Sequence, residues 1–130
     1  GLAVGDDGRL WMISQEARDG DYTALLSELD GDSGSALMQI DLRERGLGPI
    51  SIRLREKSLA AGPGSRLAWA GLQVGARGHL LALDADGQVD CLLSFDDRPL
   101  LQPLYAGDGA IYAAGIDLTD TDRATLIRVR

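Results

Sequence analysis

The sequence predicts an all-β chain built from a repeated unit of short antiparallel strands. One pattern, a small or apolar pair followed by a glycine, a turn and an alternating strand, occurs at residues 3–13, 60–70 and 105–114. Apolar residues in these strands recur at period two, which places one face of each strand in a core. The 17 glycines, set against two tryptophans, three tyrosines and one phenylalanine, indicate many tight turns between aliphatic strands.

Each copy of the pattern is followed by further strand-like segments. Alternating residues return at 37–41, 80–84 and 126–130. The first two copies continue through a turn into another apolar stretch, at 48–54 and 87–93. We therefore expect three or four strands in each unit.

Three Asp-Gly pairs predict that hairpins, rather than crossovers, connect these strands. The pairs are Asp7-Gly8, Asp86-Gly87 and Asp108-Gly109, and each suits the positive φ of a tight turn. Residues 21–29 come nearest to a helical period, but they lack convincing caps, and residues 22–26 fit a strand equally well.

The spacing of the copies is that of β-propeller blades. Leu10, Leu67 and Ile111 are separated by 57 and then 44 residues, near the roughly 40 to 50 of one blade. We expect a single all-β domain over 1–130, with repeats at approximately 2–54, 59–95 and 104–130. The surplus length of the first unit predicts an acidic insertion at approximately 14–35, as a loop on one face.

The segments SLAAG at 58–62, LAWAG at 67–71 and HLLALDADGQVD at 79–90 resemble a known repeat. They are similar to the delta-60 type of propeller repeat and to the blades of quinoprotein-like (PQQ-like) propellers, which share a strand ending in Asp, a turn and a departing strand. The resemblance covers most of the chain and is strongest over 58–115. It implies a partial propeller of two to three antiparallel blades and an extracellular or periplasmic location.

A partial propeller leaves sheet faces uncovered, because closed rings have about four to eight blades. Three arrangements are open: a segment of a longer propeller, a ring completed by another copy, or a β-sandwich. The start at Gly1 without methionine and the end inside a strand at Arg130 favour the first.

Charge and composition exclude several partners. The chain has 20 acidic and 13 basic residues and a net charge of −7, which opposes a phosphate-binding surface, so no nucleic acid is expected. No apolar run approaches the roughly 18 residues of a membrane span, so membrane insertion is not expected. The single cysteine, Cys91, is interpreted as a small apolar residue.

Residues 31–35, Gly-Asp-Ser-Gly-Ser, resemble the nucleophile loop of chymotrypsin-like serine proteases. That family places its histidine upstream of the serine, whereas His79 is the sole histidine here and follows Ser33. We interpret the motif as a polar turn and His79 as a surface or strand-edge residue. No residue is assigned a catalytic role.

Asp30 and Asp32 are the candidate metal ligands, for Ca²⁺. Asp30-Gly31-Asp32 opens like a calcium loop but lacks the later bidentate glutamate, so a solvated acidic loop is the main interpretation. No other cofactor is expected. Trp11 and Trp69 fall near equivalent positions of their units and are interpreted as packing between blades.

These observations favour a non-enzymatic β-propeller segment that acts as a binding or scaffolding module. A protein partner or self-association is expected, since blades without neighbours expose apolar faces. The alternative is part of a propeller enzyme, a quinoprotein-like oxidoreductase or a lactonase-like hydrolase, whose catalytic residues lie outside this chain.

Overall fold

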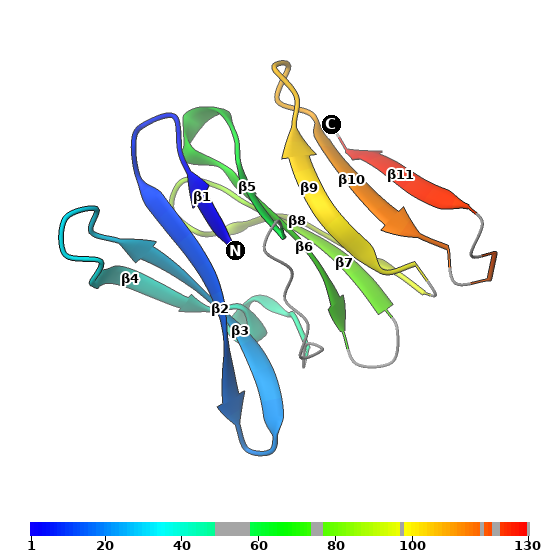
Figure 1. Cartoon of the computed structure of the whole chain (residues 1–130), viewed down its shortest axis with the longest axis horizontal. Helices are drawn as coiled ribbons and strands as arrows, with labels where there is room; N and C mark the ends of the chain where they lie inside the picture. Colours follow the sequence, from blue (N-terminus) through cyan, green and yellow to red (C-terminus); the bar gives the residue numbers. More distant parts are fainter. Residues whose placement is uncertain (49–57, 74–76, 97, 118, 121–122, 130) are drawn as a thin grey trace.

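In a computed structural model the chain folds into three antiparallel β-sheets that follow one another in chain order (Figure 1). The structure describes residues 1–48, 58–73, 77–96, 98–117, 119–120 and 123–129. The first sheet contains β1 (Leu2–Val4), β2 (Leu10–Arg18), β3 (Asp21–Leu29) and β4 (Ala36–Asp41). The middle sheet contains β5 (Leu59–Ala61), β6 (Leu67–Gln73), β7 (Arg77–Leu83) and β8 (Val89–Phe95), and the third contains β9 (Leu100–Tyr105), β10 (Ile111–Ile116) and β11 (Ala124–Val129).

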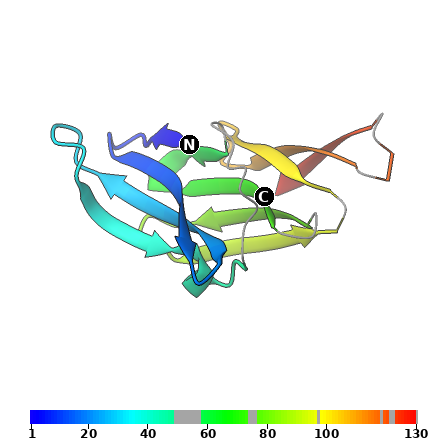
Figure 2. The same ribbon diagram turned by 60° about the horizontal axis from the view of Figure 1, so that its bottom comes forward.

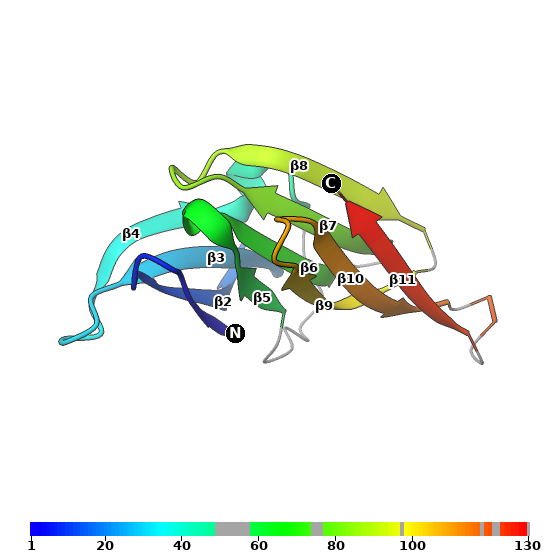
Figure 3. The same cartoon turned by 90° about the horizontal axis from the view of Figure 1, so that it is seen from above.

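The three sheets are arranged as neighbouring blades of a partial propeller. Within each sheet, strands that are consecutive in sequence pair side by side. Strand β1 lies beside β5, and β5 and β6 lie beside β9, so the first strands of the sheets are neighbours. Figure 3 shows the middle sheet between the other two. The predicted all-β fold of antiparallel blades is confirmed, in place of a two-sheet sandwich.

Helical structure in the described part of the chain is limited to short 3-10 segments, η1 (Leu42–Arg45) and η2 (Pro63–Ser65). Asp41 begins η1 by accepting a hydrogen bond from the Arg43 backbone N–H, and Gly46, with φ of 87°, ends it. No helix among these described residues has the length and apolar character needed to cross a membrane.

The middle sheet is buried on both faces, which explains its continuous apolar segments. Leu67, Trp69, Leu81 and Leu83 point toward the first sheet, where they join one core cluster. The intervening residues point toward the third sheet and form a second cluster, to which this sheet contributes Ala68, Ala70, Leu80 and Ala82. Two cores therefore meet at opposite faces of one sheet.

The predicted hairpin turns are confirmed. Gly8, Gly87 and Gly109 have φ of 82°, 74° and 79°, the left-handed region that an Asp-Gly turn requires. The turns are closed by matching backbone hydrogen bonds, such as Gly87 N–H to the Asp84 carbonyl at 3.1 Å and Gly109 N–H to the Ala106 carbonyl at 2.9 Å.

The expected loop insertion at 14–35 is wrong. The segment contains the end of β2, all of β3 and only short turns, and β2 pairs with β3 along its whole length. The extra length of the first unit falls mainly between β4, which ends at Asp41, and β5, which begins at Leu59, whereas β8 ends at Phe95 and β9 begins at Leu100. Residues 36–41 form the fourth strand of the sheet, and Figure 2 shows the turn between β3 and β4 projecting at its outer end.

Other boundaries also differ from the sequence pattern. The third sheet begins at Leu100, before the expected boundary at 104. The expectation was wrong because β9 contains Pro103, and proline is rare inside strands. Residues 21–29, the nearest approach to a helical pattern, form β3. The expected strand at 48–54 falls almost entirely outside the described residues.

Candidate functional site

A polar contact joins the turns of the first and middle sheets. The Asp6 carboxylate accepts hydrogen bonds from the backbone N–H groups of Gly64 and Ser65, at 3.0 and 3.3 Å. The Ser65 hydroxyl donates to Asp7, which Arg9 also contacts at 2.6 Å. The Ser65 hydrogen bond, followed by those from Arg9, lowers the pKa of Asp7 to about 2. The contact ties η2 to the β1–β2 turn.

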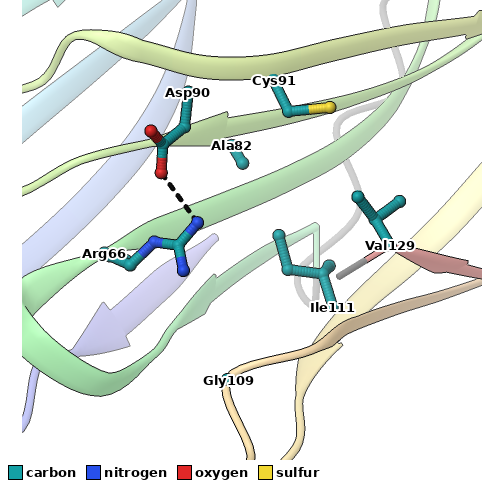
Figure 4. Close-up of a pocket in the computed structure, with 7 residues that line it drawn as sticks. All are labelled: Arg66, Ala82, Asp90, Cys91, Gly109, Ile111 and Val129. Carbon is teal, nitrogen blue, oxygen red and sulfur yellow. Dashed lines mark hydrogen bonds and ion pairs between the residues drawn. The ribbon is translucent and has the colours of Figure 1, made fainter.

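A pocket of about 340 Å³ lies between the middle and third sheets, near the same turns (Figure 4). Its size is at the lower end of the roughly 300 to 1,000 Å³ typical of ligand sites. A second hollow of about 220 Å³ shares Arg66 and Gly109 with it and adds Asp108. The main pocket is lined by Arg66, Ala82, Asp90, Cys91, Gly109, Ile111 and Val129.

The charged groups of the pocket are already paired. Arg66 donates to the Asp90 carboxylate at 2.7 Å, as the dashed line in Figure 4 marks. Tyr105 lies close to this pair, and burial raises the pKa of its hydroxyl to about 12. Within the described structure, the buried Arg66 Nε and Tyr105 Oη have no hydrogen-bond partner. Of these two atoms, Arg66 Nε belongs to a residue of the pocket lining and is the polar group that a small ligand or a water molecule would satisfy there.

Asp30 and Asp32, the candidate calcium ligands, lie in the turn between β3 and β4. Asp30 Oδ1 accepts hydrogen bonds from the Ser33 backbone N–H and hydroxyl, both at 2.7 Å, and from the Asp32 N–H at 3.2 Å. This oxygen therefore closes its own turn. Among the described residues, no group of three or more His, Cys, Asp and Glu side chains is placed to hold a metal ion. Calcium binding stays a prediction.

His79 and Ser33 do not come together. Ser33 is hydrogen-bonded to Asp30 in the exposed turn, whereas Nδ1 of His79 lies 2.9 Å from the Ser94 hydroxyl, within the middle sheet. His79 is only 4% exposed, so the expected surface position is wrong. Burial, with Arg77 adding to it, lowers the pKa of His79.

Trp11 and Trp69 pack between the first and middle sheets, 1% and 2% exposed. The interpretation as packing between blades is confirmed. Their positions are not equivalent: Leu10 and Leu67 each begin the second strand of their sheet, so Trp11 is the second residue of its strand and Trp69 the third. At period two this difference places them on opposite faces of their sheets, which meet in one core.

The first sheet exposes an apolar face on the side away from the core. Trp11 points inward, so its neighbours Leu10 and Met12 point outward. Leu2 and Val4 pair with Met12 and Leu10, and they are 61% and 66% exposed. We call this surface the β1–β4 end face, and it comprises Leu2, Val4, Leu10, Met12, Leu29 and Leu37.

The third sheet exposes a matching face at the other end of the row (Figure 3). Ile111 and Ala113 point to the core, so Tyr112 and Ala114 point away. Leu104 and Leu126 pair with these two residues and are 61% and 70% exposed. We call this surface the β9–β11 end face, and it comprises Leu104, Tyr112, Ala114, Leu126 and Arg128.

The sequence contained a signal for both end faces. The strands of the first and third sheets have apolar residues on both of their sides, although only one side of each sheet faces a core. Which side remains uncovered depends on the order of the sheets in space. The pocket had no sequence signal, because its lining comes from six different strands and turns.

No family model matches the chain, and no curated protein matches it. Among solved structures, it is similar to a GH43 endo-arabinanase from Bacillus licheniformis, with a TM-score of 0.36 and 13% identity. The alignment covers 98% of this chain and 51% of that enzyme, so the chain spans about half its length. A likeness at this level carries no information about activity.

Proposed function

We propose that the chain is a non-catalytic β-propeller segment that acts as a binding or scaffolding module through its two end faces. The observation that carries this proposal is the exposure of large apolar side chains on the outer sides of the first and third sheets. Contiguous apolar surface of this kind marks interaction sites in soluble proteins. The narrower assignment to delta-60-type or PQQ-like repeats belongs to the same proposal and rests on residues 58–115.

The acidic side chains favour a surface role over a convergent active site. Many of them are spread over the turns and strand ends, each in an ion pair with a nearby arginine. These acidic residues are Asp7, Glu16, Glu28, Asp41, Asp90, Asp96, Asp108, Asp117 and Asp120. The proposed module therefore uses apolar packing for recognition, with charges that keep the surrounding surface hydrated.

The test combines solution mass with binding of the apolar dye anilinonaphthalene sulfonate. A free end face binds the dye, whereas a covered face raises the mass, so the two measurements together detect the surface in either state. In the double variant Val4→Lys and Leu126→Lys, we expect both dye fluorescence and association to fall well below those of the wild type, with the fold retained.

The matched control is Gln88→Lys with Thr119→Lys, which adds the same charge at exposed positions outside both end faces. It should behave like the wild type. A wild-type chain that neither binds the dye nor associates would contradict the proposed function. The same holds if the end-face variant and the control lose signal equally.

A further inference from the structure

We propose that a second copy of this chain covers both end faces, with the β9–β11 end face of each copy packed on the β1–β4 end face of the other. This inference rests on the proposed function, since it names the partner of the same surfaces. Three features of the structure support it: the packing repeated inside the chain, the charges at the faces, and the number of sheets.

The middle and third sheets each have a side that corresponds to the β1–β4 end face, and in both the preceding sheet of the chain covers that side. Leu10, Leu67 and Ile111 each begin the second strand of their sheet. Leu67 is 1% exposed against the first sheet, and Ile111 is 3% exposed against the middle sheet. Leu10 occupies the same position, but no described sheet precedes it. The β1–β4 end face is thus the same kind of surface that the preceding sheet covers in the two contacts between sheets within the chain.

The β9–β11 end face is the other half of that contact. The residue after each of these positions faces the following sheet, and Trp11 and Ala68 are 1% and 0% exposed there. Tyr112 occupies this position in the third sheet, with no described sheet after it. In the first internal contact, the side of the first sheet with Trp11 packs on the side of the middle sheet with Leu67. In the second, the side of the middle sheet with Ala68 packs on the side of the third sheet with Ile111. The two end faces therefore complement each other rather than themselves, which defines a head-to-tail contact.

The charges at the two faces are also complementary. Arg128 is the charged side chain that the described β9–β11 end face presents, 5.6 Å from the Tyr112 ring centroid and 3.1 Å from Asp108. It lies near the end of β11, level with the turns between first and second strands. When sheets stack in the orientation seen within the chain, the partner's β3–β4 turn comes to this end, with exposed Asp32. Opposite charges then meet at the rim of an apolar contact.

Two copies would supply six sheets, within the roughly four to eight of closed propellers. A head-to-tail contact closes when the rotation between subunits returns to its start, and two copies then share two identical contacts. Such a ring leaves neither end face exposed. The competing occupants are a sheet from another protein or further sheets on the same polypeptide, and the experiment below separates them from a second copy.

The experiment is size-exclusion chromatography with light scattering on the 130-residue chain at several concentrations. We expect the wild type at twice 13.8 kDa. Val4→Glu damages the β1–β4 end face and Leu126→Glu the β9–β11 end face, so each variant alone should elute at 13.8 kDa. The matched control is Val89→Glu, at an apolar residue 40% exposed but outside both end faces, and it should keep the wild-type mass.

Mixing the two variants tests the head-to-tail geometry. The intact β9–β11 end face of the Val4→Glu chain can pack on the intact β1–β4 end face of the Leu126→Glu chain. An equimolar mixture should therefore form a dimer with one of each, held by this one contact, because the two substituted faces meet in the other. Circular dichroism verifies that every variant keeps its strands, and Val4→Thr with Leu126→Gln replace any that unfold.

Three results would overturn the inference. A wild type at 13.8 kDa at all concentrations means that a second copy does not cover the faces. A Val4→Glu chain that still dimerises means that the β9–β11 end faces of two copies pack on each other. A mixture that stays monomeric means that the two faces do not complement each other. If the monomeric wild type binds the apolar dye at its end faces, the proposed function stands while this inference fails.

Discussion

At the scale of the residue, the indole rings of Trp11 and Trp69 connect the first sheet to the middle sheet. Each is almost fully buried, and both belong to one cluster that also contains Leu26 and Leu81. The Trp69 ring lies over Gly71, where a Cβ atom would overlap it. The ring therefore fills a space that only a glycine leaves open, and large aromatic side chains dominate the packing of such cores.

Trp69→Ala should lower the free energy of unfolding by about 3 to 5 kcal/mol, because it removes a buried aromatic ring and leaves a cavity between two sheets. Leu126→Ala is the control, since Leu126 is 70% exposed, and in the monomer we expect a change within about 0.5 kcal/mol. Urea denaturation followed by circular dichroism measures both. Equal effects for the two variants would show that Trp69 is not a core residue.

His79 should make stability depend on pH near neutrality. Burial, with Arg77, lowers its folded pKa below the ordinary value of 6.5. The folded state therefore favours the neutral ring, so its contribution is complete above about pH 6.5 and declines as the pH falls through the lowered folded pKa. We expect denaturation midpoints to fall between about pH 7 and pH 5. His79→Gln, which can still bond Ser94, should flatten this dependence, and an unchanged slope would exclude His79 as its source.

At the scale of the element, the third sheet depends on a close approach to β7. The backbone carbonyl of Arg98 lies where a Cβ atom on Gly78 would stand, and the Leu100 nitrogen would be 3.0 Å from that atom. Segment 98–100, which leads into β9, thus crosses directly over a strand of the middle sheet. A glycine is required here for space rather than for a positive φ.

Gly78→Ala should destabilise the chain by about 1 to 3 kcal/mol, the range for inserting a methyl group into packed surroundings. Gly107→Ala is the matched control, because a Cβ atom there meets nothing within 4 Å. Thermal denaturation of both variants gives the comparison. Hydrogen exchange should show the loss of protection concentrated in β7 and β9. A uniform loss, or none, would contradict the role assigned to Gly78.

At the scale of the element, sequence spacing matched residues 37–41 with residues 80–84, although 37–41 lie in the fourth strand of the first sheet and 80–83 end the third strand of the middle sheet. Strands β2 and β3 also have 9 residues each, whereas β6 and β7 have 7. Four of residues 16–21 are charged because that end of the hairpin is exposed, and a charged strand end resembles a loop in the sequence. The alternation in 22–26 was the correct signal for β3.

At the scale of the whole molecule, three sheets bury only the surfaces between them. The middle sheet has both faces covered, and each outer sheet has one covered face and one end face. A row of sheets always has two such ends, because only closure into a ring removes them. Association through the end faces is therefore the expected behaviour of this architecture, and the mass and mixing experiments measure it directly.

The surroundings of His79 and of the pocket depend on strands that are distant in the sequence. A histidine after a glycine-rich stretch suggested a strand edge, yet β7 lies between β6 and β8, so His79 pairs with Gly71 on one side and Ser94 on the other. The pocket at Arg66 and Asp90 unites residues from separate sheets and turns. Local patterns carry no information about which distant strand lies opposite a given side chain.

By itself the sequence determined the all-β class, the hairpin turns at the Asp-Gly pairs and the repetition of the unit. These depend on local chemistry: period-two alternation, positive φ at glycine and the spacing of similar segments. Only the tertiary structure decided that Trp11 and Trp69 share one core between two sheets, that residues 14–29 belong to a hairpin, and which faces of the outer sheets stay uncovered. Alternation separates the two sides of a strand, but long-range packing decides which side meets another sheet.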